Sequence, residues 1–154
     1  MHVITNVRKS TKSHLEALRH LIADNDEIVI CSGWMKMCGL SELLADIDRA
    51  LSRGATISVY TNHEHTETSC VSALAERSNL YHFNIPRPTY LHTKLYFGRR
   101  DDTYRVIIGS ANITSGGLWK NEELSQGRTG RLDDEFHSQI AEYLERLPGL
   151  ISSQ

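Results

Sequence analysis

The chain has 154 residues, of which 40% are hydrophobic and 23% are charged, and its formal net charge is −2. Its length is enough to bury roughly two-thirds of the unfolded surface, and its composition excludes collagen-like, low-complexity and disordered proteins. No stretch approaches the ~18 apolar residues of a membrane span, and a charge near zero excludes a generally basic nucleic-acid coat protein. We expect one domain over residues 1–154.

The N-terminus and the cysteines both favour a cytoplasmic location. Residues 1–6 lack the basic start and apolar run of a secretory signal. Cys31, Cys38 and Cys70 are odd in number and widely spaced, which argues against a disulfide scaffold and fits a reducing compartment. Because no paired histidines accompany Cys31 and Cys38, we expect both to be small buried hydrophobic residues.

In the first half of the chain, helical and strand patterns alternate. Residues 13–16 form a capping box, and apolar residues then recur at helical spacing up to Ile22. A second helical stripe runs from Leu40 to Leu51 and stops at Gly54. Trp34, Met35 and Met37 are interpreted as packing in the core or a dimer interface, with substrate contact as the lesser alternative. The other expected elements are strands at 27–32, 55–61 and 80–84 and a helix at 68–77.

The second half predicts a strand pair and a final helix. Residues 90–98 and 104–110 have strand patterns joined by a polar turn, and 133–147 has a helical stripe with an acidic first turn. Strands alternating with helices indicate an α/β domain with helices on both faces of one sheet. The strand pair makes that sheet mixed, and we expect it to be mostly parallel.

Three short segments contain residues suited to chemistry on an anion. On a strand, His92 and Lys94 share one face at about 7 Å, close enough to hold one anion between them. The next predicted strand ends at Gly109, where small residues allow close approach, and Ser110 and Asn112 can donate hydrogen bonds. Glu123 offers a carboxylate that could orient a ring N–H of His92.

These segments resemble the His-Lys-Asp motif of the phospholipase D superfamily. They are His92-Thr93-Lys94, Gly109-Ser110-Ala111-Asn112 and Asn121-Glu122-Glu123, and the resemblance extends over essentially the whole chain. It implies a phospholipase D-like α-β-α fold and a phosphodiesterase that uses no metal and no cofactor. The family usually has aspartate five residues after the motif lysine, and here Arg99 stands there, with Asp101 and Asp102 in a longer turn. Since that aspartate is mainly structural, we expect activity to survive.

The resemblance also implies a mechanism. His92 attacks phosphorus to give a phosphohistidine, while Lys94, Asn112 and Ser110 stabilise charge in the transition state. Glu123 fixes the tautomer of His92. A second histidine must protonate the leaving oxygen, and this chain carries one motif copy. We therefore predict a homodimer with one active site across its two-fold axis.

Nucleic acid, and DNA rather than RNA, is the predicted substrate. The chain shows no membrane-anchoring helix, and basic residues flank the motif segments. Analogy favours a restriction or other defence-type endonuclease. Gly109, Thr114, Arg87 and Lys120 are expected to bind substrate. The alternatives are a cardiolipin-type phospholipid phosphodiesterase and a non-catalytic nucleic-acid-binding module of the same fold.

A second histidine-rich segment, His63-Glu64-His65, raises the alternative of a metal site. Two histidines without a third ligand are weak support for such a site. We interpret the segment as a polar loop and expect no bound metal.

Overall fold

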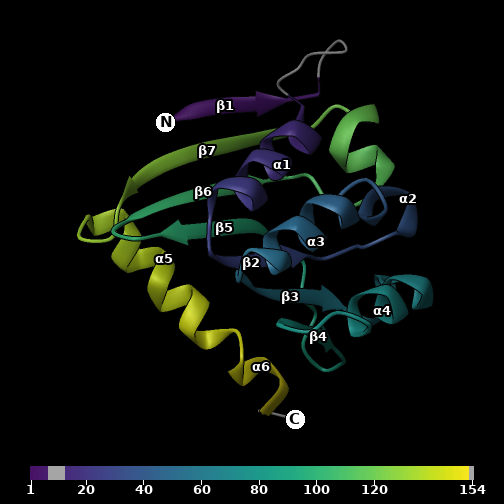
Figure 1. Cartoon of the computed structure of the whole chain (residues 1–154). Helices are drawn as coiled ribbons and strands as arrows, with labels where there is room; N and C mark the ends of the chain where they lie inside the picture. Colours follow the sequence, from purple (N-terminus) through teal and green to yellow (C-terminus); the bar gives the residue numbers. More distant parts are fainter. Residues whose placement is uncertain (7–12, 153–154) are drawn as a thin grey trace.

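A computed structural model describes residues 1–6 and 13–152 of the chain. In this part of the chain one seven-stranded sheet has the order β1-β7-β6-β5-β2-β3-β4, which Figure 1 shows from β1 at the top to β4 at the bottom. The strands are β1 (His2–Thr5), β2 (Glu27–Ser32), β3 (Thr56–Asn62), β4 (Leu80–Ile85), β5 (Lys94–Arg100), β6 (Thr103–Gly109) and β7 (Leu124–Arg131). The helices are α1 (His14–Asp24), α2 (Met37–Leu40), α3 (Leu44–Ser52), α4 (Thr68–Ala75), α5 (Glu135–Arg146) and α6 (Gly149–Ser152), with the short helices η1 (His63–His65) and η2 (Gly116–Lys120).

The sheet is mixed, as predicted, but most neighbouring strands pair antiparallel, so the expectation of a mostly parallel sheet is wrong. Parallel pairing joins β2 to β3 and β3 to β4. Antiparallel pairing joins β1 to β7, β7 to β6, β6 to β5 and β5 to β2. Parallel neighbours need a crossover, usually a helix, and only the first half of the chain supplies crossover helices between successive strands.

Most predicted elements of the first half are confirmed within a few residues. The side chain of Ser13 caps α1 by accepting a hydrogen bond from the backbone N–H of Glu16, as the capping box predicts. β2 has its predicted bounds. Gly54 follows α3 with a φ of +95°, a conformation that glycine adopts without steric cost.

Two strands were missed, and one was predicted to begin too early. β1 and β7 are short or polar and carry few apolar residues that alternate along the chain. The predicted strand at 90–98 begins only at Lys94, since residues 86–93 form a loop. Side-chain and backbone donors hold that loop: Asn62 donates to the carbonyl of Leu91, and the N–H of Gly33 donates to the carbonyl of Thr93.

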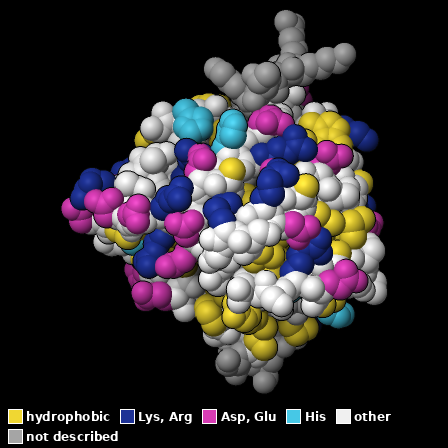
Figure 2. All heavy atoms as spheres, in the orientation of Figure 1, with side chains coloured by type: hydrophobic (Ala, Val, Ile, Leu, Met, Phe, Trp, Pro, Cys, Tyr) yellow, Lys and Arg dark blue, Asp and Glu magenta, His cyan; other side chains and the backbone are white. Residues whose placement is uncertain are grey.

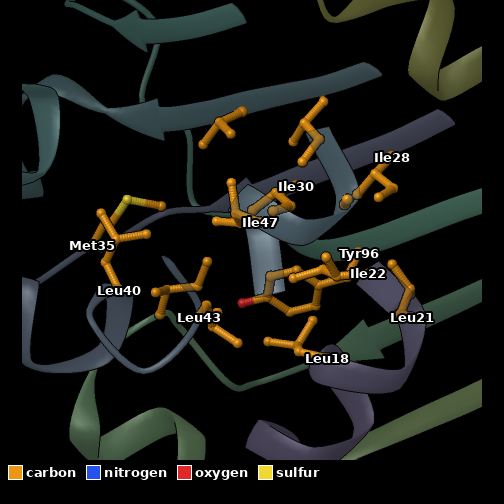
Figure 3. Packing of buried hydrophobic residues seen from close by; sticks show 14 of the residues in the cluster. Leu18, Leu21, Ile22, Ile28, Ile30, Met35, Leu40, Leu43, Ile47 and Tyr96 are labelled. Atoms are coloured by element: carbon orange, nitrogen blue, oxygen red, sulfur yellow. The ribbon is translucent and has the colours of Figure 1, made fainter. Parts of the chain in front are cut away.

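Helices cover both faces of the sheet and enclose two apolar cores, which confirms the layered α/β prediction. Residues from α1, α3 and α4 pack on one face against β2, and Figure 3 shows Leu18, Leu21 and Ile22 of α1 with Ile28 and Ile30 of β2. On the other face, apolar residues of α5 pack against strands β5 and β6. No helix in the described part of the chain is long and apolar enough to cross a membrane.

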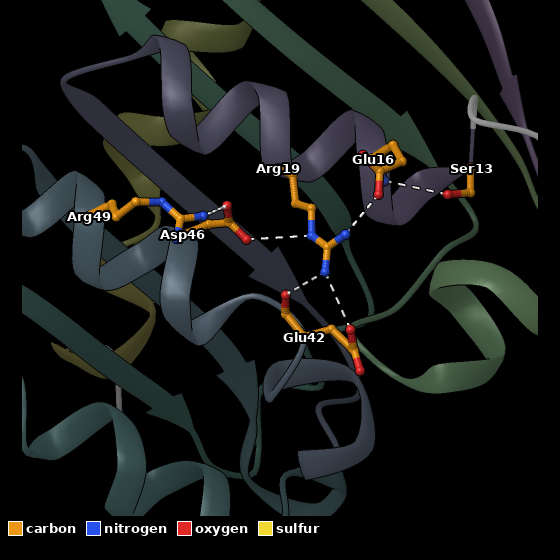
Figure 4. Close-up of polar contacts among 6 residues, drawn as sticks. All are labelled: Ser13, Glu16, Arg19, Glu42, Asp46 and Arg49. Atoms are coloured by element: carbon orange, nitrogen blue, oxygen red, sulfur yellow. Dashed lines mark hydrogen bonds and ion pairs between the residues drawn. The ribbon is translucent and has the colours of Figure 1, made fainter.

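Polar contacts join α1 to the segment that precedes α3 (Figure 4). The guanidinium of Arg19 pairs with Glu16 in its own helix at 2.8 Å, and it also donates to the backbone carbonyl of Glu42 at 3.2 Å. The side chain of Asp46, in α3, lies 3.5 Å from the same guanidinium. The first helical layer is therefore connected by a charge network as well as by apolar packing.

A buried histidine links α1 to the start of β7. The ring of His14 contacts Asn6 through Nδ1 and Ser125 through Nε2, both at 2.8 Å. The amide of Asn6 donates to the carbonyl of Gly117, so its oxygen is the atom that faces the ring. An amide oxygen only accepts, so Nδ1 of His14 carries the hydrogen and the hydroxyl of Ser125 donates to Nε2. Burial lowers the pKa of His14, while the charge of Glu123 opposes that shift.

Replacing Gly39 by alanine should destabilise the protein. A Cβ at Gly39 would lie 2.5 Å from the backbone nitrogen of Thr114 and 2.7 Å from the backbone carbon of Ile113. Backbone atoms have no alternative rotamer, so we expect the free energy of unfolding to fall by about 1–3 kcal/mol in urea denaturation. Gly149→Ala is the matched control, because nothing lies within 4 Å of its added Cβ. Equal stability of the two variants would contradict the packing described here.

His14 should make stability fall in mild acid. Because burial lowers its pKa below the ordinary value of 6.5, the unfolded chain takes up a proton that the folded chain does not. Its contribution to the free energy of unfolding is present above pH 6.5 and is lost as the pH falls below that value. Denaturation of His14→Gln between pH 8 and 5 should show a flatter profile than the original chain. His20→Gln, which removes an exposed histidine from the same helix, is the control, and parallel profiles for His14→Gln and the original chain would contradict the assignment.

Candidate active site

The predicted catalytic residues converge on one edge of the sheet. There the ends of β2 and β6 meet the beginnings of β5 and β7, because β5 and β7 run antiparallel to their neighbours. A hollow of about 480 Å³ opens at this edge. It is lined by Trp34, Lys36, Cys38, His92, Asn112, Thr114, Ser115, Gly116, Gly117, Asn121 and Glu123.

His92 and Lys94 touch each other directly. Nζ of Lys94 lies 2.9 Å from Nε2 of His92, and it also donates to the backbone carbonyl of His92 at 2.8 Å. An ammonium group has no lone pair, so Nε2 of His92 accepts and is the unprotonated ring nitrogen in this arrangement. Burial lowers the pKa of Lys94, and the charge of Glu123 partly offsets this shift. The pair thus presents a nucleophilic nitrogen beside a cation.

Asn112 is oriented by the loop that follows β2. Its side-chain oxygen accepts a hydrogen bond of 3.0 Å from the backbone N–H of Trp34. This contact leaves the amide NH2 of Asn112 as the group that can donate into the hollow. Two neighbouring contacts fix the same loops: the Ser32 hydroxyl accepts from the N–H of Ile113, and the buried Tyr96 hydroxyl donates to the carbonyl of Ala111.

Ser110 and Glu123 form a second polar pair. The hydroxyl of Ser110 donates to the carboxylate of Glu123 and accepts a hydrogen bond of 3.1 Å from the N–H of Leu124. The sequence predicted that Glu123 would bind the ring of His92. Glu123 instead binds Ser110, because β6 and β7 are neighbours and their ends bring these two side chains together.

The predicted substrate-binding residues have different environments. The Thr114 hydroxyl lines the hollow and accepts from the N–H of Gly117. Gly109 lies against β7, where a Cβ would meet the backbone oxygen of Leu124 at 2.5 Å, so its small size serves strand packing. Arg87 forms a two-point ion pair with Glu64, outside the hollow. Lys120 is exposed at the end of η2 and is not among the residues that line the hollow.

Three residues after β2 line the hollow, although none of them was among the predicted site residues: Trp34, Lys36 and Cys38. Trp34 is 39% exposed, so the interpretation that it packs in the core is wrong, whereas Met35 is buried in the core as interpreted. The alternatives of a dimer interface or substrate contact for Trp34 stay predictions. Cys38 is exposed and accepts from the N–H of Ser115, which lowers the pKa of its thiol, whereas Cys31 is buried as predicted. All three follow β2, and residues just after a strand whose carboxyl end faces a ligand site are the signal that could have revealed them.

The remaining sequence alternatives concern the histidine-rich segment and Arg99. His63–His65 forms η1, in which Glu64 pairs with Arg87 and His65 contacts Tyr90. Within residues 1–6 and 13–152, no group of three metal-binding side chains is found. Arg99 lies toward the end of β5, away from the hollow at the strand's beginning, and pairs with Glu27 at 2.8 Å.

Known proteins resemble this chain in sequence profile and in fold. The family profile described as "Cardiolipin synthase, PLD-like domain" matches residues 18–147. NucT from Helicobacter pylori superposes with a TM-score of 0.74 at 15% identity, over 96% of this chain and 94% of that chain. Nuc from Salmonella typhimurium, a phospholipase D family member, gives 0.71 at 14% identity, over 97% and 93%.

A larger protein contains the same fold as one part. A mutant of yeast tyrosyl-DNA phosphodiesterase gives a TM-score of 0.63 at 15% identity, over 99% of this chain and 39% of that chain. No curated protein sequence matches the chain significantly. The family profile covers most of the chain and includes all the motif segments. The chain therefore belongs to the PLD-like domain family of the phospholipase D superfamily.

Proposed function

We propose that this chain is a metal-independent phosphodiesterase that acts through a phosphohistidine at His92. The observation that carries the proposal is the exposed His92 ring, whose Nε2 accepts from the Lys94 ammonium beside a polar hollow. Nε2 attacks phosphorus, a P–N bond forms, and the bond to the leaving oxygen breaks. Water then attacks phosphorus, breaks the P–N bond and regenerates His92. Splitting one displacement into two steps is the advantage of a covalent intermediate.

The surrounding residues have separate roles in this proposal. Lys94 and the amide of Asn112 stabilise negative charge on the non-bridging phosphate oxygens. Preorganised donors of this kind often contribute several kcal/mol to transition-state stabilisation. Ser110 positions Glu123, whose carboxylate lines the hollow and favours the positive charge that develops on the His92 ring.

The chemistry also needs a group that protonates the leaving oxygen and later activates water. Among the described residues that line the hollow, His92 is the only histidine. A second copy of the chain, related by a two-fold axis, would bring the partner's His92 to the same phosphate. The proposed enzyme is therefore a homodimer with a shared site.

An exposed apolar patch beside the site supports this homodimer. The patch consists of Met1, Val3, Ile108 and Leu124, which lie on one face of the β1-β7-β6 end of the sheet. Leu124 is 63% exposed and directly follows Glu123, and Ile108 lies two residues before Ser110. A second copy seated on this patch reaches the site edge and removes apolar surface from water.

Nucleic acid is the proposed substrate. Seven of the eleven residues that line the hollow have polar or charged side chains, which can contact a phosphodiester and its neighbouring groups. Tyrosyl-DNA phosphodiesterase, which has the same fold, is named for a DNA phosphodiester. Basic and acidic residues are interspersed on the face that Figure 2 shows, so any phosphate track is local rather than a broad basic face. The cardiolipin alternative is favoured by the name of the family profile and by the apolar patch, which would then contact lipid. A restriction or defence role stays a prediction by analogy.

Metal-independent cleavage is the first test. We expect the protein to cleave single-stranded DNA, plasmid DNA or RNA in excess EDTA, and His92→Ala to lower the rate at least about 1,000-fold, because it removes the nucleophile. Acid-labile phosphate on His92, trapped by rapid quenching and detected by mass spectrometry, would identify the intermediate. His20→Ala, an exposed histidine on α1, is the control.

Two other outcomes would contradict the proposal in different ways. Cleavage that appears only after addition of a divalent metal would contradict the mechanism. Hydrolysis of cardiolipin vesicles without cleavage of any nucleic acid would contradict the substrate and favour the lipid alternative.

The homodimer gives a second prediction. Leu124→Asp places a charge in the apolar patch, so we expect the mass measured by light scattering to fall from dimer to monomer and activity to fall at least about 10-fold. Ile151→Asp, which changes an exposed apolar residue on α6, should leave the dimer intact.

When unfolded His92→Ala and original chains are refolded together in equal amounts, activity should be about one quarter of the activity of the same total amount of original chain, since only dimers of two original chains keep both histidines. A value near one half would contradict a shared site.

A further inference from the structure

An aromatic row, defined as Trp34, His65, Tyr90 and His92, runs along the surface beside the candidate nucleophile. The ring of Trp34 stacks on His65 with centroids 4.6 Å apart and an interplanar angle of 19°. His65 meets Tyr90 edge to face at 5.6 Å, and Tyr90 is stacked with His92 at 6.1 Å. Four residues from three separate segments, with Tyr90 and His92 in the same loop, thus form a continuous set of ring contacts.

Polar contacts hold the middle of the aromatic row. The Tyr90 hydroxyl lies 2.7 Å from Nε2 of His65. The guanidinium of Arg87 lies over the Tyr90 ring at 4.9 Å and is itself fixed by its ion pair with Glu64. These contacts leave His65 little freedom, and His65 in turn supports one face of Trp34. Trp34 is therefore preorganised rather than a loose surface side chain.

Trp34 lies between two hollows. One is the hollow of about 480 Å³ that contains His92 and Asn112. The other, of about 300 Å³, is lined by Lys36, His65, Thr66, Glu64 and Glu67 as well as Trp34. The backbone N–H of Trp34 donates to the side chain of Asn112, which is a predicted phosphate ligand. The Trp34 ring therefore belongs to a residue in direct contact with that ligand. A group that stacks on Trp34 would be adjacent to the reacting phosphate.

The second hollow suits a neutral planar group better than another phosphate. Its lining includes the carboxylate of Glu67, which disfavours an anion and accepts from the N–H of Met37 through Oε2, so that Oε1 can accept from an N–H group of a ligand. Both oxygens of Glu64 are bound by Arg87. An acyl chain placed there would have to desolvate the charged side chains of Lys36 and Glu67. A flat ring with polar edges that stacks on indole meets these requirements, and a nucleobase is such a group.

We propose that Trp34 is the stacking platform for an unpaired nucleobase next to the scissile phosphate, so that the substrate class is single-stranded nucleic acid. This inference rests on the proposed nuclease activity and specifies its substrate. A base within a duplex is paired and stacked on its neighbours, so its face is not available to Trp34. Lys36 lines both hollows, so the backbone of a nucleic-acid strand that spans them would pass beside its ammonium group.

The test uses a short oligothymidylate with one cleavable phosphodiester, its other linkages being methylphosphonates. Two further strands carry an abasic site on one or the other side of the cleavable bond. We expect the protein to cleave the intact strand about 10-fold faster than one of the abasic strands, the size typical of one base stacked on an aromatic ring. Annealing the intact strand to its complement should slow cleavage by at least as much.

The role of Trp34 is tested by the ratio of the cleavage rates of the intact and abasic strands, measured for each variant. This ratio does not depend on the absolute activity of the variant. Trp34→Ala should cleave intact and abasic strands at equal rates, and Trp34→Phe should keep most of the discrimination. Tyr81→Ala, which removes an exposed aromatic residue from the edge strand β4, should keep the full ratio. Circular dichroism and urea denaturation check that each variant is folded.

The outcomes separate this inference from the proposed function. Cleavage of the intact strand with no discrimination against either abasic strand would overturn the platform and leave the nuclease standing. Discrimination that persists in Trp34→Ala would overturn it too, since the base would then be recognised elsewhere. If no strand is cleaved, the proposed nuclease fails, and the platform fails with it.

Discussion

The buried hydroxyl of Ser32 is the contact on which the arrangement of the site depends. Ser32 ends β2, and its hydroxyl donates to the carbonyl of Trp34 and accepts from the N–H of Ile113. Together with the backbone hydrogen bond from Lys36 to Ile113, this side chain joins the loop after β2 to the loop after β6. A buried hydroxyl left without these partners would be costly. Asn112 and Trp34 approach each other only because these two loops are joined. The polar hollow lies above this junction, on a rigid sheet edge.

The loop that carries His92 is held in a similar way from the opposite side. It lies outside the sheet, yet the N–H of Gly33 and the side chain of Asn62 bind its carbonyl groups. His92 therefore emerges from a fixed backbone but has freedom to leave Lys94 and reach a phosphate, which a residue within the strand ladder would lack. Lys94 is the first residue of β5, so its backbone is held by the sheet. Such a fixed position suits the role proposed for Lys94, which is to stabilise charge on the phosphate oxygens.

Several surface features oppose the stability of an isolated chain. Leu124, Val3 and Ile108 are apolar and exposed on the part of the α5-side sheet face that α5 itself does not cover, and Trp34 is exposed at the hollow. Elsewhere the surface carries ion pairs, such as Arg19 with Glu16 and Arg77 with Asp48. Tyr81 and Ile151 are exposed elsewhere as single residues, whereas a group of exposed apolar residues around one site is typical of surfaces that bind a partner or ligand. The proposed homodimer and base platform give these groups contacts.

The sequence by itself determined the local elements and the set of candidate catalytic residues. The capping box at Ser13, the apolar run of β2 and the acidic start of α5 act through neighbours in the chain, so their patterns are readable without the fold. Likewise His92, Lys94, Asn112 and Glu123 were found from motif spacing. Only the tertiary structure decided that Glu123 binds Ser110, that Trp34 faces the hollow and that antiparallel pairs dominate the sheet. Those outcomes depend on which distant strands become neighbours, as with β7 beside β6, and local periodicity carries no information about that choice.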